Sequence, residues 1–90
     1  MTLVKVALYH AAGCHLCERA RGVIKDVRAE VPFEFNEIDI GGDADSEAKY
    51  REWLPVVEIE GERSFVYYVD RGALLRKLQQ CERDSAKAGG

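Results

Sequence analysis

The stretch that decides the fold is LVKVALYHAAGCHLCERARGVI, which spans residues 3–24. Leu3–Tyr9 is rich in Val, Leu and Ala, a composition typical of a buried strand, and the following Gly13 is a strand breaker. From His15 the apolar residues recur at helical spacing, which predicts a helix from His15 to about Glu30. A strand therefore leads through a short turn into a helix, and two cysteines lie where the helix begins.

Proline and glycine residues divide the rest of the chain into five further elements. They are a strand, a short helix that Asp43 or Asp45 can cap, two strands that form a hairpin, and a last helix that Asp70 can cap. Their expected bounds are Phe33–Ile40, Asp43–Trp53, Val56–Glu60, Arg63–Val69 and Asp70–Cys81. The order is then β-α-β-α-β-β-α, in which the first two strands are parallel and the hairpin adds antiparallel strands. We therefore expect an α/β fold with a mixed sheet and helices on both of its faces.

The composition is that of one small globular domain without a basic surface for nucleic acid. The chain has 90 residues, of which 47% are apolar and 32% charged, and its net charge is −3 with Lys and Arg scattered. No segment is long and apolar enough to span a bilayer, and the N-terminus lacks the layout of a signal peptide. We therefore expect a cytoplasmic protein that binds neither nucleic acid nor membrane. We expect residues 1–81 to form its single domain and the polar residues 82–90 to form a flexible tail.

The cysteine pair opens the first helix in the sequence Cys14-His15-Leu16-Cys17. Free backbone N–H groups and the helix dipole favour an anion at this position, so the Cys14 thiolate is stabilised as a nucleophile for disulfide exchange. Cys17 follows one helical turn later on the apolar side, where it can resolve a mixed disulfide. A protonated His15 would favour the thiolate further, although the same residue could be a solvated histidine at a helix start.

A Cys-x-x-Cys pair also occurs in zinc sites, which need two further ligands. The other soft candidates are His10, His15 and Cys81, and the sequence has no second Cys-x-x-Cys and no His-x-x-x-His. In a reducing compartment a close cysteine pair is more often catalytic or metal-binding than structural, and an odd number of cysteines argues against a disulfide framework. We therefore expect a redox pair and no metal.

Four other side chains can be interpreted from their spacing. Helical periodicity places Cys81 in the core as a small apolar residue. Trp53 either lines a substrate groove beside Pro55 or packs as a core anchor. Tyr67 and Tyr68 alternate along the last expected strand, which predicts that one faces the core and the other faces solvent.

With this strand, motif and helix in place, the chain resembles the glutaredoxins. It is most similar to the bacterial glutaredoxin-like proteins that carry a Gly-Cys-His-Leu-Cys-Glu stretch, here Gly13–Glu18. The resemblance extends over about residues 3–81 and includes Leu54-Pro55-Val56-Val57. It implies a thioredoxin fold with a four-stranded sheet, in which the bond before Pro55 is cis and faces the redox pair. It also implies that the backbone of Leu54 pairs with an extended substrate. Without the resemblance, Pro55 could simply be the end of a helix.

Three regions differ from the glutaredoxins that bind glutathione. Those proteins usually carry a basic residue shortly before the first cysteine and Thr-Val before the proline, where this chain has His10-Ala11-Ala12 and Trp53-Leu54. Their glycine pair and acidic residue after the fourth strand correspond here to residues 67–72, in which only Asp70 and Arg71 could pair with the glutathione termini. We therefore expect no tightly bound cofactor, with glutathione as a candidate co-substrate.

These features predict a glutaredoxin-like enzyme, a dithiol–disulfide oxidoreductase that uses Cys14 and Cys17 to reduce disulfides of proteins or small molecules. Its electron donor would be a reductase or glutathione, and we expect a monomer that serves in electron transport. The candidate substrate-binding residues are Leu54, Pro55, Asp70 and Arg71. Two alternatives stay open. One is a thioredoxin-fold module whose cysteines hold a metal or dock a partner without turnover, and the other is a transferase-like role with bound glutathione.

Overall fold

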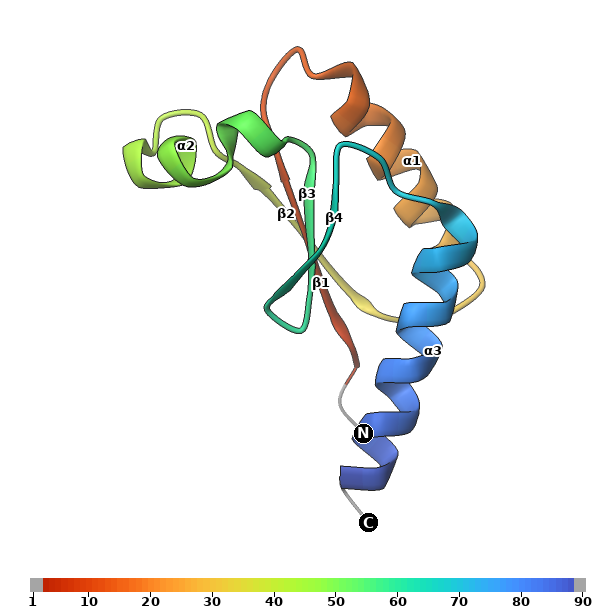
Figure 1. The fold of residues 1–90 in the computed structure, drawn as a ribbon. Coiled ribbons are helices and arrows are strands. Elements are labelled where there is room, and N and C mark those ends of the chain that lie inside the picture. The colour runs from red at the N-terminus through yellow and green to blue at the C-terminus, as the bar shows by residue number, and fades with distance from the viewer. Residues whose placement is uncertain (1–2, 89–90) are drawn as a thin grey trace.

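A four-stranded mixed sheet forms the centre of the protein (Figure 1). The computed structural model describes the backbone of residues 3–88 and the side chains of residues 3–81. The elements follow in the order β1 (Lys5–His10), α1 (His15–Arg28), β2 (Glu34–Asp39), α2 (Ala44–Tyr50), the 3₁₀ helix η1 (Arg51–Trp53), β3 (Val56–Ile59), β4 (Glu62–Val66) and α3 (Arg71–Ala88). The predicted α/β class and element order are confirmed.

The strands lie side by side in the order β2-β1-β3-β4. β1 and β2 are parallel and are joined through α1, whereas β3 is antiparallel to both β1 and β4. The β3–β4 hairpin turns at Glu60 and Gly61, whose φ angles of 54° and 81° are both positive, as a two-residue type I′ turn requires. β1 and β3 are therefore the two central strands, and the loops at their ends lie next to each other.

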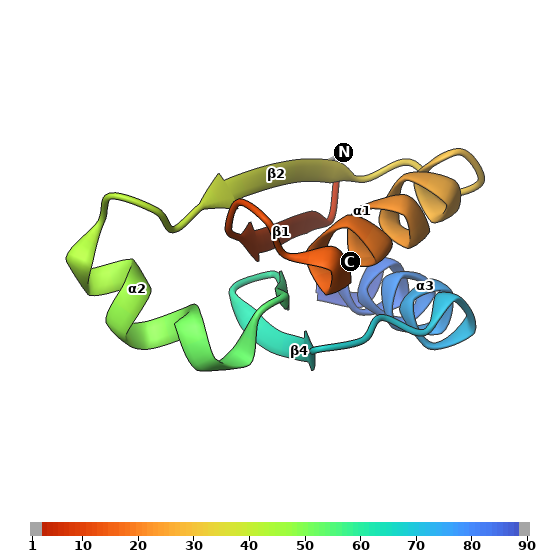
Figure 2. The ribbon, with the colours of Figure 1, turned by 90° about the horizontal axis from the view of Figure 1, so that it is seen from above.

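Helices lie on both faces of the sheet (Figure 2), and each face carries its own apolar cluster. α1 and α3 cover one face because their apolar stripes recur at helical spacing. Their buried side chains are Ala20, Ile24, Val27, Leu74 and Leu78, which pack on Val6, Leu8, Val57 and Ile59 of the sheet. α2 covers the opposite face, where Tyr50 is buried with Ile40 and Val56. Helices thus lie on both faces, as predicted.

The last strand is shorter than predicted, and the tyrosines that follow it are placed differently. β4 ends at Val66 because Tyr67 has a φ of 65°, in the left-handed region that breaks a strand. Tyr67 and Tyr68 are 39% and 69% exposed. The prediction that one of them faces the core is therefore wrong.

Two helix ends also differ from expectation. α3 continues to Ala88, so the predicted end near Cys81 is wrong; residues 89–90 of the predicted tail lie outside the described part of the chain. Asp43 stands at the start of α2, but its carboxylate accepts a hydrogen bond from Ser46 Oγ at 2.5 Å and none from a backbone N–H of that helix.

No helix within the described residues is both long and apolar enough to cross a membrane.

Candidate redox site

Three loops meet at one end of the sheet, and the cysteine pair lies on the first of them. Tyr9 near the end of β1 pairs with Val56 at the start of β3, and Val56 pairs with Val66 at the end of β4. The turn from β1 into α1, the segment before β3 and the loop after β4 therefore lie at the same end of three neighbouring strands. Figure 1 shows these three connections together above the sheet.

Cys14 is the N-cap residue of α1. Its backbone is extended (φ −89°, ψ 105°), and its Sγ accepts a hydrogen bond from the backbone N–H of Cys17 at 3.2 Å. An N–H of the first helical turn that has no backbone acceptor is thus directed at the sulfur, which is the arrangement by which helix N-termini bind anions. Cys14 is half-buried, and both cysteines of the motif are free thiols. The predicted nucleophile therefore combines access with an anion-binding environment.

Cys17 lies one turn into α1 and is 2% exposed. Burial raises the pKa of its thiol to about 12, and the hydrogen bond to Cys14 acts in the same direction. A backbone hydrogen bond from Ala11 and the positive charge of Arg21 oppose this shift without cancelling it. Cys17 therefore holds its proton while Cys14 faces solvent, which is the division of roles that a resolving and an attacking thiol need.

His15 lies beside the pair in sequence but points away from it. Its side chain is 96% exposed, and Nδ1 is 3.9 Å from the carboxylate of Glu18, one turn later on α1. The structure gives no contact between the imidazole and Cys14 Sγ. The role of His15 in favouring the thiolate stays a prediction.

The segment before β3 supplies the second side of the site. The Leu54–Pro55 bond is cis, as the resemblance implied, and Pro55 is fully buried. The Pro55 carbonyl accepts a hydrogen bond from the Tyr67 N–H at 3.0 Å, which joins this segment to the loop after β4. No described residue donates a hydrogen bond to the Leu54 carbonyl. Its role in pairing with substrate stays a prediction.

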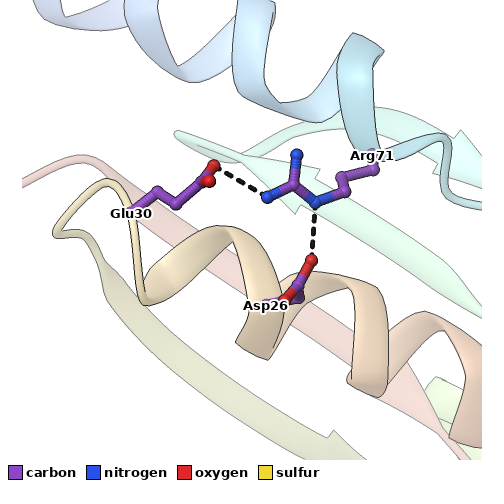
Figure 3. Close-up of polar contacts among 3 residues, drawn as sticks. All are labelled: Asp26, Glu30 and Arg71. Carbon is purple, nitrogen blue, oxygen red and sulfur yellow. Dashed lines mark hydrogen bonds and ion pairs between the residues drawn. The ribbon is translucent and has the colours of Figure 1, made fainter.

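Asp70 and Arg71 lie at the start of α3 and are engaged elsewhere. The Asp70 carboxylate accepts a hydrogen bond from the Ala73 N–H at 2.8 Å, so the predicted cap is confirmed. Arg71 Nε is 2.6 Å from Asp26, and a terminal nitrogen is 2.8 Å from Glu30 (Figure 3). Asp26 follows His15 by eleven residues on α1, which is roughly 16 Å along the helix axis. The structure therefore does not bring Arg71 to the cysteine end of α1.

The ion pairs of Arg71 have an electrostatic reason. A cation in the first turn of a helix is disfavoured by the helix dipole, and the carboxylates of Asp26 on α1 and of Glu30 just after α1 offset this. The hydrogen bonds to Asp26 and then to Glu30 raise the pKa of Arg71 above its usual value. Arg71 thus links the start of α3 to the C-terminal part of α1, away from the cysteine end of that helix.

Arg21 was not identified from the sequence, whereas Trp53 was named there as either a groove-lining residue or a core anchor. Arg21 lies one turn after Cys17 and forms an ion pair with Glu37 of β2, and the i, i+4 spacing from Cys17 could have indicated it. Trp53 is 41% exposed and is not a core anchor; it lies beside Pro55 in sequence and contacts the Tyr67 ring. Among the described residues, no group of three or more His, Cys, Asp or Glu side chains is placed to hold a metal ion.

The comparisons with known proteins agree with this geometry. The thioredoxin from Halobacterium salinarum is 19% identical, with a TM-score of 0.63 over 88% of this chain and 74% of that one. The fold is thus that of thioredoxin, and a Cys-x-x-Cys pair at the start of α1 in this fold indicates a redox function. The model of the Glutaredoxin-like domain (DUF836) matches residues 5–79, and the chain belongs to this family.

Two solved structures have higher TM-scores than the Halobacterium salinarum thioredoxin. A structural-genomics protein from Nitrosomonas europaea is 25% identical, with a TM-score of 0.74 over 87% of this chain and 94% of that one. A second one, from X. campestris, is 27% identical, with a TM-score of 0.71 over 83% and 96% of the two chains. No curated protein matches the sequence.

The burial and pKa of Cys17 predict a large difference in alkylation between the two cysteines. In the reduced protein between about pH 7 and about pH 9, iodoacetamide should modify Cys14 at least about tenfold faster than Cys17. The raised pKa keeps Cys17 protonated over this range, so its modification should increase only as the pH approaches 12. Timed quenching and peptide mass spectrometry measure both rates in one molecule. Equal rates at neutral pH would contradict the assignment of the two roles.

The ion pairs of Arg71 predict a loss of stability in Arg71→Gln. The urea midpoint of the reduced protein should fall, because α1 and α3 lose both contacts, and the loss should shrink at high salt. Arg76→Gln is the matched control, since Arg76 carries the same charge on α3 and forms no ion pair with a described residue. Equal midpoints for the two variants would show that the Arg71 contacts do not stabilise the helix pair.

Proposed function

We propose that this protein is a thiol–disulfide oxidoreductase that reduces disulfides of proteins or small molecules with Cys14 and Cys17. The observation that carries the proposal is the hydrogen bond from the Cys17 N–H to Cys14 Sγ at the start of α1. It supports a thiolate at the accessible position, and the buried, protonated Cys17 supports a second thiol in reserve. The family and the thioredoxin fold support the same chemistry.

The reaction begins with attack of the Cys14 thiolate on one sulfur of a substrate disulfide. The substrate S–S bond breaks, the leaving thiolate takes a proton from water, and a mixed disulfide forms between Cys14 and the other half of the substrate. Cys17 Sγ then attacks Cys14 Sγ and gives its proton to the departing substrate thiolate. The substrate has gained two electrons and two protons, and the protein carries a Cys14–Cys17 disulfide.

Substrate binding is proposed at the segment before β3. The unpaired Leu54 carbonyl lies at the end of the sheet that carries Cys14, beside Pro55, and supports main-chain pairing with an extended substrate. Asp70 and Arg71 could meet the charged termini of glutathione only if Arg71 left Asp26 and Glu30. This favours a dithiol reductase over glutathione as the electron donor.

The electron donor regenerates the dithiol by the reverse exchange. A donor dithiol, or two glutathione thiols in succession, attacks the Cys14–Cys17 disulfide. Cys14 and Cys17 return to thiols, and the donor is released as its own disulfide. Such a cycle suits a reducing compartment such as the cytoplasm, where exchange returns the pair to thiols. We propose that the protein works there as a monomer, with glutathione as an alternative co-substrate and no tightly bound cofactor.

Cysteine substitutions test the proposed order of the two steps. Cys14→Ser should abolish reduction of insulin and of small disulfides, because the attacking sulfur is lost. Cys17→Ser should accumulate a mixed disulfide through Cys14 that intact-mass measurement detects as the added mass of the substrate half. Cys81→Ser is the matched control, because Cys81 packs against the α1–α3 core and lies outside the site. Full turnover by Cys14→Ser would overturn the proposal.

A further inference from the structure

Exposed aromatic side chains gather around the segment that carries the cis-proline. Among the described residues the large apolar side chains that are exposed are Leu3, Trp53, Tyr67 and Tyr68. Trp53 precedes Leu54 directly, and Tyr67 is held against Pro55 by its backbone hydrogen bond. Exposed aromatics concentrated beside one site are typical of a surface that meets a partner.

Trp53 and Tyr67 form a fixed platform, named here the aromatic shelf. Their ring centroids are 6.1 Å apart with an interplanar angle of 37°. The Tyr67 hydroxyl donates a hydrogen bond to the Glu52 carbonyl at 3.0 Å, and its backbone N–H donates to Pro55. Both ends of Tyr67 are therefore held, while 41% of Trp53 and 39% of Tyr67 stay open to solvent. A rigid aromatic surface of this kind binds at a low cost in side-chain entropy.

The backbone of Tyr67 also points to a role for its side chain. With a φ of 65° it occupies the left-handed region, which disfavours residues with a Cβ and which glycine adopts freely. A glycine would make the same turn without strain. An aromatic residue held in a strained conformation next to a reactive site is a recognised mark of function.

A positive charge borders the aromatic shelf. The Arg63 guanidinium carbon lies 6.0 Å from the centroid of the Trp53 ring and 5.8 Å from that of Tyr50. Arg63 forms no ion pair with a described residue. Its neighbour across the strand pair, Glu58, uses its two carboxylate oxygens to accept hydrogen bonds from Tyr9 and Tyr50 at 3.2 and 3.1 Å. The edge of the shelf can therefore take a carboxylate from a partner.

We propose that the aromatic shelf binds a segment of a protein substrate next to its reactive cysteine. The segment is extended, with its main chain along Leu54, an apolar or aromatic side chain on Trp53 and Tyr67, and an acidic residue at Arg63. Side chains two residues apart lie on the same side of a strand, so one segment can present its cysteine and its apolar residue together. Glutathione has no apolar side chain for the shelf. This inference rests on the proposed function and specifies its substrate class.

Two synthetic peptides test the proposal. Both carry one cysteine as a mixed disulfide with 2-mercaptoethanol; the first has Phe two residues from the cysteine and a nearby Glu, and the second has Ala and Gln there. Rate constants for reduction by the wild-type protein should favour the first peptide by about tenfold, which corresponds to about 1.4 kcal/mol. Trp53→Ala and Tyr67→Gly should each lower this ratio because they remove contacts with the Phe side chain, and Arg63→Gln should lower it because it removes the partner of the Glu carboxylate.

The controls separate this inference from the function on which it rests. Tyr67→Gly keeps the turn, because glycine accepts the positive φ, and Tyr67→Phe keeps the ring and should retain the preference. Tyr68→Ala removes the neighbouring exposed tyrosine and should leave the ratio unchanged. Bis(2-hydroxyethyl) disulfide, which is too small to reach the shelf, should be reduced equally by all variants.

Three results would overturn the inference while leaving the oxidoreductase intact, provided that the small disulfide is still reduced. The first is equal rates for the two peptides with the wild-type protein. The second is an undiminished preference in both Trp53→Ala and Tyr67→Gly. The third is a loss of glutathione disulfide reduction in those variants that is as large as their loss of reduction of the first peptide. Failure of the wild-type protein to reduce the small disulfide as well as the peptides would overturn the proposed function itself.

Discussion

The hydrogen bond between the Cys17 N–H and Cys14 Sγ is the interaction on which the site depends. It exists because β1 ends and α1 begins within a few residues, so that Cys14 occupies the N-cap position and Cys17 the first turn. An N-cap residue normally satisfies a free backbone N–H with an oxygen. A sulfur in that place gains a donor that stabilises its charge, and the helical rise then fixes the second sulfur one turn away on the buried side. One local constraint thus assigns different chemistry to two identical residues.

The sheet brings the rest of the site to that helix start. Antiparallel pairing of β3 with β1 and β4 places the residues before β3 and after β4 at the end of the sheet where β1 ends. Pro55 and Tyr67, twelve residues apart in sequence, are joined there by a backbone hydrogen bond. The face opposite α1 and α3 is covered by α2, whose Tyr50 stacks on Tyr9 with ring centroids 4.0 Å apart. Helices therefore pack on both faces of the central strands β1 and β3, and this packing fixes the positions of the three loops relative to one another.

Features that depend on neighbours in sequence were predictable. The Cys14–Cys17 placement and the Asp70 cap involve residues three apart, and their geometry follows from helical periodicity alone. The ion pair of Arg71 with Asp26 spans 45 residues, and only the packing of α3 on α1 creates it. For Arg71 the family resemblance indicated glutathione, whereas the structure engages the same side chain in holding two helices together.

The end of β4 shows a different limit. Tyr67, Tyr68 and Val69 have high strand propensity, which predicts that the strand continues. The left-handed φ of Tyr67 ends the strand at Val66, and nothing in the local sequence indicates it because glycine is the usual residue in that conformation. The same departure turns the Tyr67 ring toward Trp53, so the feature that sequence reasoning missed is also the one that distinguishes this site.

An equilibrium redox titration tests the central claim most directly. The protein is equilibrated in buffers of graded ratios of reduced to oxidised glutathione, whose potentials span those of thioredoxin-fold cysteine pairs, alkylated, and measured by intact mass and peptide mapping. The account predicts a single two-electron transition, with a shift of about 30 mV for each tenfold change in the ratio of reduced to oxidised protein. In the oxidised form Cys14 and Cys17 should be joined within one chain, with Cys81 alkylated throughout. Oxidation that instead links chains through Cys14, or a pair that stays reduced at every ratio, would contradict it.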